Sequence, residues 1–317
     1  MAKQRTSWVV WLRRVCQAAF LILFFWLFLQ TAYHPINKTN GPVDLFFDLD
    51  PLVTLNAWLA SHTVLRAMLF SLGTVVVTVL MGRWFCGWIC PFGALHNLTT
   101  SLRGTKSKAK LEVGGYSRWQ KVKYYLLTGF LAAGILGVNV VGWLDPFSFL
   151  YRSLATAIYP ALNRAIVSVF TVIYDLNPGV GSVRLTGVTE PVYDVLRKHF
   201  LAVEQPYYWG GELMGLLFFL VIGLNFFRAR FWCRYICPLG ALLGILGKNP
   251  LIRLKKNEEQ CNNCRLCLVD CQGGASPEKN QDGWKPSECF YCWNCKSDCP
   301  SQAIHFAITV PKETKRS

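Results

Sequence analysis

The stretch that decides the organisation of this chain runs from Cys261 to Pro300 and contains CNNCRLCLVDC (261–271) and CFYCWNCKSDCP (289–300). Each segment has the spacing C-x2-C-x2-C-x3-C, so eight cysteines form two copies of one pattern. Three thiols of each copy come from one short loop, and the fourth follows after three intervening residues. Thiols this close in sequence can converge on one inorganic centre.

This spacing is typical of bacterial ferredoxins, in which the fourth cysteine of each motif binds the cluster of the other motif. The pattern predicts two [4Fe-4S] clusters, with the ligand sets Cys261, Cys264, Cys267 and Cys299, and Cys289, Cys292, Cys295 and Cys271. A disulfide framework or two all-cysteine zinc sites are the alternatives. Zinc ligands usually come as separated C-x2-C pairs, so the unbroken triplets favour iron–sulfur clusters.

The two motifs end differently. The second ends Cys299-Pro300, whereas the first ends Cys271-Gln272. Proline restricts its own backbone, so the chain after Cys271 is less restrained than the chain after Cys299. We therefore expect both clusters to form, with different hydrogen bonds around them.

The composition indicates a membrane protein. Of 317 residues, 52% are hydrophobic and 16% are charged, whereas about a quarter of the residues in soluble domains are charged. The net charge of +15 comes from basic residues beside hydrophobic segments, so we predict contact with membrane lipid and no nucleic-acid binding. Twelve of the thirteen cysteines lie in metal-type motifs, which leaves Cys16 as a packing residue.

Four apolar segments are predicted to be transmembrane helices: residues 15–33, 64–81, 124–143 and 213–227. Residues 150–174 are also apolar, but Arg164 would fall near the centre of a span. A charge at that depth is costly, so a re-entrant or interfacial helix pair is predicted there.

The basic residues predict the orientation. About four precede the first segment, about eight lie between the second and third, and about seven lie in residues 228–256 directly after the fourth, against one between the first and second. The positive-inside rule then places both termini in the cytoplasm and the loops 34–63 and 145–211 in the periplasm.

The predicted fold is a mainly α, polytopic membrane protein of the bacterial inner membrane. It consists of a transmembrane domain, residues 1–248, with four helices and a long periplasmic loop. An α+β cytoplasmic domain, residues 249–317, follows and has the two-cluster ferredoxin pattern.

A second cysteine pattern occurs twice at the predicted cytoplasmic membrane edge, as RWFCGWICPFGAL (83–95) and RFWCRYICPLGAL (230–242). Each copy carries C-x3-C-P, and its proline can begin a new helix. If the two copies pack together, four thiolates become available for a third iron–sulfur cluster: Cys86, Cys90, Cys233 and Cys237. Buried thiol pairs or a catalytic dithiol are the alternatives.

Three residues near these motifs are candidates for a quinol head-group site: Trp88, Tyr235 and His96. Aromatic side chains at a membrane edge are most often interface anchors, and the sequence does not separate that role from a pocket wall. His96 is the candidate proton acceptor, although a lone histidine is usually a polar contact.

Four apolar segments, two C-x3-C-P motifs and a C-terminal two-cluster segment together resemble the NapH family of membrane polyferredoxins, and the membrane and ferredoxin half of the NosR family. The resemblance implies a quinol dehydrogenase or electron-transfer subunit. It would move electrons between the quinone pool and redox partners such as ferredoxin-like, cytochrome or reductase subunits. Two alternatives remain: a redox maturation or regulatory protein, NosR- or CcoG-like, and a cluster-bearing membrane anchor of a larger respiratory complex.

Overall fold

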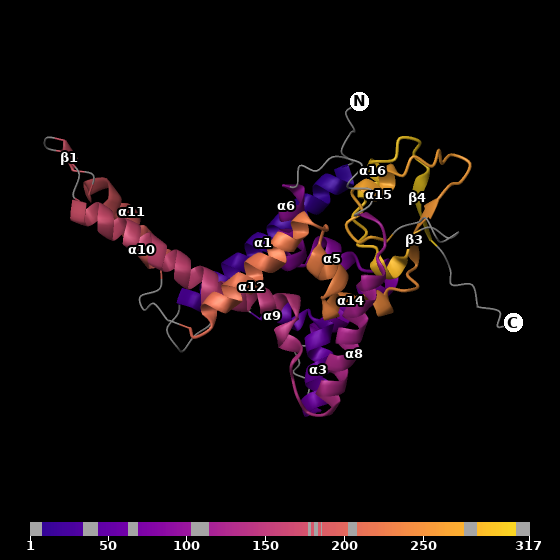
Figure 1. Cartoon of the computed structure of the whole chain (residues 1–317), viewed down its shortest axis with the longest axis horizontal. Helices are drawn as coiled ribbons and strands as arrows, with labels where there is room; N and C mark the ends of the chain where they lie inside the picture. Colours follow the sequence, from indigo (N-terminus) through magenta and orange to yellow (C-terminus); the bar gives the residue numbers. More distant parts are fainter. Residues whose placement is uncertain are drawn as a thin grey trace. The chain divides into compact units, whose positions relative to one another are not determined.

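The computed structural model describes residues 8–33, 44–62, 69–102, 114–176, 179–180, 183–184, 186–201, 208–275 and 284–308 (Figure 1). The first helices are α1 (Trp8–Tyr33), α2 (Leu45–Asp48), α3 (Pro51–Ser61), α4 (Ser71–Met81), α5 (Trp84–Trp88) and α6 (Pro91–Ser101). The middle of the chain contains η2 (Arg118–Lys121), α8 (Val122–Ile135), η3 (Val141–Trp143), α9 (Pro146–Ser153), the π-helical turn η4 (Leu154–Ile158), α10 (Tyr159–Leu176) and α11 (Thr186–His199).

The last helices are α12 (Gly211–Gly223), η5 (Leu224–Phe226), α13 (Phe231–Tyr235), α14 (Pro238–Leu246), α15 (Leu266–Val269), η6 (Pro286–Glu288) and α16 (Asn294–Ser297). The strands form two antiparallel pairs, β1 (Gly179–Val180) with β2 (Val183–Arg184), and β3 (Ile252–Lys256) with β4 (Ile304–Ile308). The described chain is thus mainly helical, as predicted.

The chain forms two compact units. The first comprises Met1–Ile22, Asp44–Ser148 and Val221–Ser317, and the second comprises Leu23–Val43 and Phe149–Leu220. The first unit contains every motif cysteine. The predicted domain boundary between residues 248 and 249 separates the segment with the C-x3-C-P motifs from the segment with the ferredoxin-like motifs. This boundary stays a prediction.

Two helices of the described residues are long and apolar enough to cross a membrane, namely Trp8–Thr31 and Pro146–Leu176. The first corresponds to the first predicted span. The helices Ser71–Met81 and Gly211–Phe226 are apolar but shorter. The four-span topology and the inward position of both termini stay predictions.

Residues 150–174 form one continuous helix rather than the expected helix pair, because α9, η4 and α10 follow one another without a break. Pro160 lacks the amide hydrogen that a regular helix requires. The π-helical turn η4 ends two residues before Pro160, and such a turn lets a helix continue past a local defect. Whether this helix spans the membrane or lies at its surface stays a prediction.

The segment with the two C-x2-C-x2-C-x3-C motifs is closed by a strand pair. β3 precedes both motifs and β4 follows them, and they pair from Ile252↔Ile308 to Lys256↔Ile304. A small core forms beneath the strands from Leu254, Ala275, Trp284, Cys295 and Ile304. Cys267, Cys271, Cys289 and Cys299 pack against this core, so the fold of the segment and the placement of its thiols are linked.

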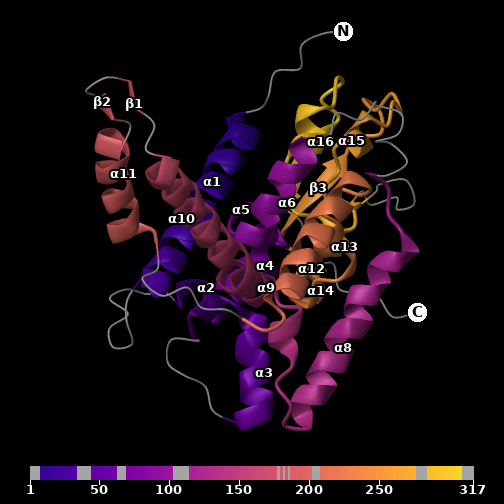
Figure 2. The same cartoon turned by 60° about the vertical axis from the view of Figure 1, so that its left-hand side comes forward.

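The helices of the C-x3-C-P motifs lie beside this segment in both views of the molecule (Figures 1 and 2). α14 packs against η6, and α4 packs against β3. At Gly87 in α5 the backbones approach so closely that an added β-carbon would overlap the carbonyl oxygen of Phe290. The two kinds of cysteine motif are therefore in direct backbone contact.

Replacing Gly87 by alanine should force these two backbones apart. Overpacking of this kind costs about 1–3 kcal/mol, so we expect a lower thermal unfolding midpoint for the detergent-solubilised protein. The matched control is Gly129→Ala in α8, where an added β-carbon meets no atom within 4 Å. Equal midpoints for the two variants would contradict the close contact between α5 and Phe290.

Candidate metal centres

The two C-x2-C-x2-C-x3-C motifs share one unusual backbone conformation. In each loop, the residues directly before and after the second cysteine have positive φ: Asn263 (53°) and Arg265 (59°), and Tyr291 (50°) and Trp293 (64°). This region is uncommon for residues other than glycine, and each instance costs about 1–2 kcal/mol. Four different side chains adopt it at matching positions, so the placement of the thiols, not local preference, determines the loop.

Short helices then carry the third cysteine of each motif. Cys267 lies in α15 and Cys295 in α16, and the two helices pack against each other. The chain turns after each helix and brings the fourth cysteine, Cys271 or Cys299, back toward the other motif.

Four thiols line one cavity, and they are Cys271, Cys289, Cys292 and Cys295. Three come from the second motif and Cys271 comes from the first. Trp284, Phe290 and Tyr291 complete the wall. The structure thus brings together the four residues that the ferredoxin spacing assigns to the second cluster.

The other cysteines of the two motifs lie near Cys267. The pKa of the Cys267 thiol is raised to about 12, first by burial and then by the neighbouring thiols of Cys271, Cys264, Cys299 and Cys261. Three of these neighbours are its predicted partners. Cys264 of the first group is exposed, whereas Cys292 and Cys295 of the second group are buried, and the other thiols of both groups are half-buried.

The C-x3-C-P motifs place their cysteines at helix ends. Cys86 lies in α5 and Cys90 caps α6; Cys233 lies in α13 and Cys237 caps α14. Each proline occupies the first turn of the new helix, as predicted.

Backbone amides point at the capping thiols. The Gly93 amide donates to Cys90 Sγ at 3.4 Å, and the Gly240 amide donates to Cys237 Sγ at 3.2 Å. A helix N-terminus favours a thiolate over a thiol.

These four thiols are buried and close to one another. Burial raises the pKa of Cys237 well above its usual range, and the thiols of Cys233, Cys86 and Cys90 raise it further. Burial and two of the same neighbours, Cys233 and Cys86, raise the pKa of Cys90. The two repeat copies therefore contribute to one site, as the sequence repeat predicts.

Two buried arginines each donate a hydrogen bond to the other repeat copy. Arg83, which opens the first copy, donates from Nη2 to the carbonyl oxygen of Cys233 at 3.4 Å. Arg230, which opens the second copy, donates from Nη1 to the carbonyl oxygen of Cys86 at 3.0 Å. Each arginine thus holds the cysteine loop of the other copy.

Some nitrogen atoms of these two arginines donate no hydrogen bond within the described residues. Among the described residues, Arg230 Nε and Nη2 and Arg83 Nε are buried and have no hydrogen-bond partner. A buried cation requires a nearby negative charge. A [4Fe-4S] cluster with four thiolate ligands is negatively charged, so the Arg230 guanidinium fits such a cluster between the two copies, whereas Arg83 already has Glu288 as a counter-ion.

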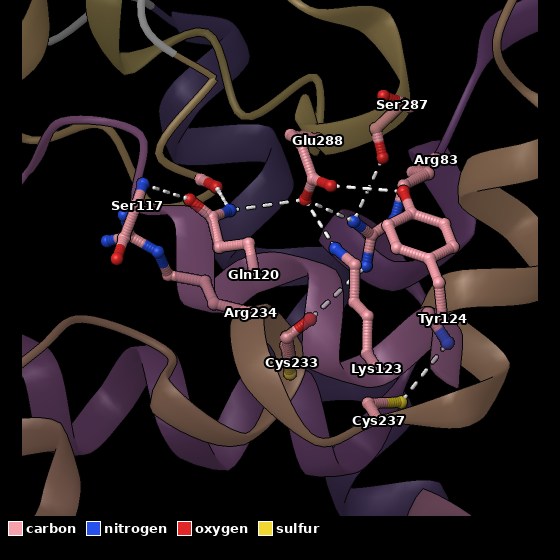
Figure 3. A network of polar contacts seen from close by, with 12 residues as sticks. Arg83, Ser117, Gln120, Lys123, Tyr124, Cys233, Arg234, Cys237, Ser287 and Glu288 are labelled. Atoms are coloured by element: carbon pink, nitrogen blue, oxygen red, sulfur yellow. Dashed lines mark hydrogen bonds and ion pairs between the residues drawn. The ribbon is translucent and has the colours of Figure 1, made fainter. Parts of the chain in front are cut away.

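Glu288, directly before Cys289, is the centre of a buried polar network (Figure 3). Its side chain is 3% exposed, and its Oε2 pairs with Arg83 Nη1 at 3.3 Å and with Lys123 Nζ. Gln120 Nε2 donates to the same oxygen at 3.2 Å, and the Tyr124 hydroxyl donates to Oε1 at 3.0 Å. This carboxylate links α8 and the first C-x3-C-P motif to the second cysteine loop.

Phe290 forms a second link between the sites. Its ring centre lies 4.6 Å from Arg83 Cζ and 5.0 Å from Arg230 Cζ, so it contacts both crossed arginines. Cation–π contacts of this kind strengthen when water is excluded. Because Phe290 belongs to the loop of Cys289 and Cys292, one ring connects that loop to the C-x3-C-P site.

Within the described residues, no three His, Cys, Asp or Glu side chains are gathered closely enough to hold a single metal ion. The ligands of an iron–sulfur cluster bind different iron atoms, so they do not have to converge on one point.

The predicted quinol residues lie in the packed interior. His96 is fully buried, with Nδ1 2.8 Å from Asn225 Oδ1. Trp88 Nε1 donates to the carbonyl oxygen of Tyr291 at 3.1 Å, and the Tyr235 ring packs on Phe231 with 4.9 Å between ring centres. Their role toward a quinol stays a prediction.

Sequence reasoning did not single out Arg83, Arg230 or Glu288. The two arginines had a signal, since each stands three residues before the first cysteine of its repeat copy. No sequence pattern marks Glu288, because its hydrogen-bond partners lie more than 160 residues away in the sequence.

Comparison with known proteins finds a family model described as a 4Fe-4S binding domain, which matches residues 63–110 and 211–257. Each matched segment contains one C-x3-C-P motif, and neither reaches Cys261. No solved structure matches the chain.

Three relatives have informative names. "Ferredoxin-type protein NapH" of Escherichia coli is 26% identical over 96% of this chain and 89% of its own length. "Putative electron transport protein YccM" of the same organism is 24% identical over 79% of this chain and 58% of its own length. "Regulatory protein NosR" of Pseudomonas aeruginosa is 28% identical over 72% of this chain, but over 26% of its own length.

Replacing Glu288 by glutamine should destabilise the protein strongly. It leaves Arg83 and Lys123 buried without their counter-ion, and breaking a buried pair typically costs about 3–5 kcal/mol. Denaturant unfolding in detergent measures the loss. The control is Glu258→Gln, which removes an ion pair with Lys256 in which Glu258 is 76% exposed and should cost about 1 kcal/mol or less. Equal losses would show that the Glu288 network is not a buried charge centre.

His96 should make stability depend on pH. Burial lowers the pKa of His96 to about 4, whereas an unfolded histidine titrates near 6.5. Because the folded pKa is depressed, the unfolded chain takes up the proton first, so stability falls as pH decreases from about 6.5 toward 4.

His96→Gln should remove this part of the acid sensitivity. Thermal unfolding of both proteins at several pH values between about 4.5 and 7.5 measures it, and the wild type should lose more stability on acidification than the variant. Parallel curves would mean that His96 is not held neutral by burial.

Proposed function

Because the chain is related to the NapH/NosR-like polyferredoxins, we propose that it is a membrane-bound iron–sulfur protein that passes electrons between the quinol pool and redox partner proteins. One observation carries the proposal: the buried thiols of both C-x3-C-P motifs form one site, and this site contacts the second cysteine loop through Phe290 and Glu288. Such contact is what stepwise electron transfer requires.

The proposal assigns three clusters to twelve cysteines. Cys261, Cys264, Cys267 and Cys299 hold the first, and Cys271, Cys289, Cys292 and Cys295 hold the second. Cys86, Cys90, Cys233 and Cys237 hold the third. Bound clusters supply one-electron acceptors and donors, with potentials that depend on hydrogen bonds and solvent exposure.

The residues of the chain prepare these sites in three ways. Burial of the C-x3-C-P cysteines excludes water from the third site. Arg230 offsets the negative charge there, and Arg83 and Arg230 fix the two copies against each other. Gly87 and Phe290 bring the second and third sites together.

The surface site is the one suited to a protein partner. Cys264 is exposed, and Cys261 and Cys267 are half-buried. A soluble redox protein can approach Cys264 closely, whereas the C-x3-C-P cysteines and Cys292 and Cys295 are buried. We therefore place the exchange with a ferredoxin-like, cytochrome or reductase partner at the first cluster.

The exposed side chains support a membrane location. Large apolar residues point outward from α1 (Trp11, Ile22 and Trp26), from α4 (Leu72 and Val76) and from α12 (Leu213, Leu216 and Phe219). Soluble monomers rarely expose apolar patches larger than a few hundred Å². These faces fit contact with lipid in the bacterial inner membrane, with the ferredoxin-like segment in the cytoplasm.

The similarity to a protein named as a regulator favours a second candidate function, in which the clusters serve redox regulation or maturation of another protein. Reduction of the clusters by quinol distinguishes the two candidate functions. An electron carrier of the quinol pool has clusters that a water-soluble quinol reduces, whereas a regulator has clusters that do not respond to quinol.

Iron content tests the cluster assignment. The reconstituted protein should contain about twelve irons per chain and lose its visible absorbance with dithionite. Cys86→Ser or Cys237→Ser should lower the content to about eight irons. Cys16→Ser, outside all motifs, is the control and should leave it unchanged. About eight irons in the wild type would remove the third cluster from the account.

A further inference from the structure

A cavity of about 460 Å³ lies within the first compact unit, beside the first cysteine motif. This is the size of a typical small-molecule site. Its lining includes Arg13, Gln17 and Leu21 of α1, Asn97 and Leu98 of α6, and Cys271. The cavity thus adjoins a predicted ligand of the second cluster.

One wall of this cavity is a chain of hydrogen bonds. Arg13 Nη1 donates to Gln272 Oε1 at 3.1 Å, and Gln272 Nε2 donates to Asn97 Oδ1. Asn97 Nδ2 donates to Gln17 Oε1 at 2.9 Å, and Gln17 Nε2 donates to the carbonyl oxygen of Gly87 at 2.7 Å. The wall therefore runs from the residue after Cys271 to α5, between Cys86 and Cys90.

A second arm of the wall reaches the other cysteine loop. Arg13 Nη2 donates to Asn294 Oδ1 at 3.2 Å, and Asn294 stands between Cys292 and Cys295. Arg13 is buried, and among the described residues its Nε has no hydrogen-bond partner. Arg13 thus ties α1 to both cysteine loops and retains a free donor.

Another part of the lining is apolar. Ala18 and Leu21 follow Gln17 along α1, and Ala94 and Leu98 face the cavity from α6. α1 continues as a helix long enough to cross a membrane. The cavity therefore combines polar groups near the cysteine loops with an apolar part formed by Ala18, Leu21, Ala94 and Leu98.

We propose that this cavity binds the head group of a quinone, with the ring against the amide wall and the apolar tail along Leu21 and Leu98. A quinone accepts hydrogen bonds and a quinol also donates them, and amide side chains can do both. The proposal rests on the proposed exchange of electrons with the quinol pool, and it assigns the site of that exchange.

The charges in the cavity favour a neutral ligand over a phospholipid head group. The Nη atoms of Arg13 are engaged by two amide oxygens, and the opposite charges of Arg14 and Asp270, which both line the cavity, offset each other. Quinol oxidation there releases two electrons and two protons. Clusters held by the cysteine motifs would supply one-electron acceptors for these electrons, with Cys271 as the ligand nearest the cavity, and the protons would pass to water.

Photolabelling of the purified, cluster-loaded protein with an azido-quinone locates the site. The label should map to peptides that contain residues 13–21 or 94–101. Equilibrium dialysis with a short-chain quinone gives its affinity, and Gln17→Leu or Asn97→Leu should weaken binding at least about tenfold, because each removes hydrogen-bonding groups from the wall.

Leu98→Trp is a second variant that leaves the polar wall intact, and Leu98 is 53% exposed, so the protein should fold. The added bulk should block the tail and also weaken binding. The matched control is Asn163→Leu, a buried amide of α10 outside this unit, which should leave the affinity unchanged. Iron content and dithionite reduction should match the wild type in every variant.

Labelling elsewhere, or unchanged affinity in both Gln17→Leu and Leu98→Trp, overturns this site even if quinol still reduces the clusters. Tightly held phospholipid that quinone does not displace from the cavity overturns it as well. Wild-type protein that binds no quinone, and whose clusters quinol does not reduce, overturns the proposed function together with the site.

Discussion

The arrangement of the cysteine motifs depends on the buried charge centre formed by Glu288, Arg83 and Lys123. Two cations and one carboxylate can be buried together only when their hydrogen bonds are satisfied, and here Gln120 and Tyr124 complete the bonds of Glu288. Arg83 also holds the Cys233 loop. One carboxylate therefore fixes the second cysteine loop, α8 and both C-x3-C-P copies relative to one another.

The three thiol sites differ in exposure. The C-x3-C-P cysteines are buried, Cys292 and Cys295 are buried under Trp284, and Cys264 is exposed. Phe290 links the first two sites, and the packing of α15 on α16 links the last two. The clusters proposed for these sites would form one continuous path across the first compact unit.

Sequence spacing was sufficient to predict which cysteines lie together and where α6 and α14 begin, because both depend on residues close in the chain. It could not predict the crossed arginines or the role of Glu288, whose contacts join residues 144–205 positions apart. It also predicted a helix pair at residues 150–174 where the structure has one continuous helix, because a π-helical turn that accommodates a proline has no simple sequence pattern. The candidates Trp88, Tyr235 and His96 were chosen by residue type, whereas the amide wall at Gln17 and Asn97 depends on contacts between distant segments.

The central claim is that the C-x3-C-P cysteines hold a redox-active cluster in contact with the ferredoxin-like pair. Electron paramagnetic resonance of the fully reduced protein tests it most directly. The account predicts about three unpaired spins per chain, with spectra broadened by interaction between neighbouring clusters. A spectrum that integrates to about two spins, with the signal of a simple two-cluster ferredoxin, would contradict it.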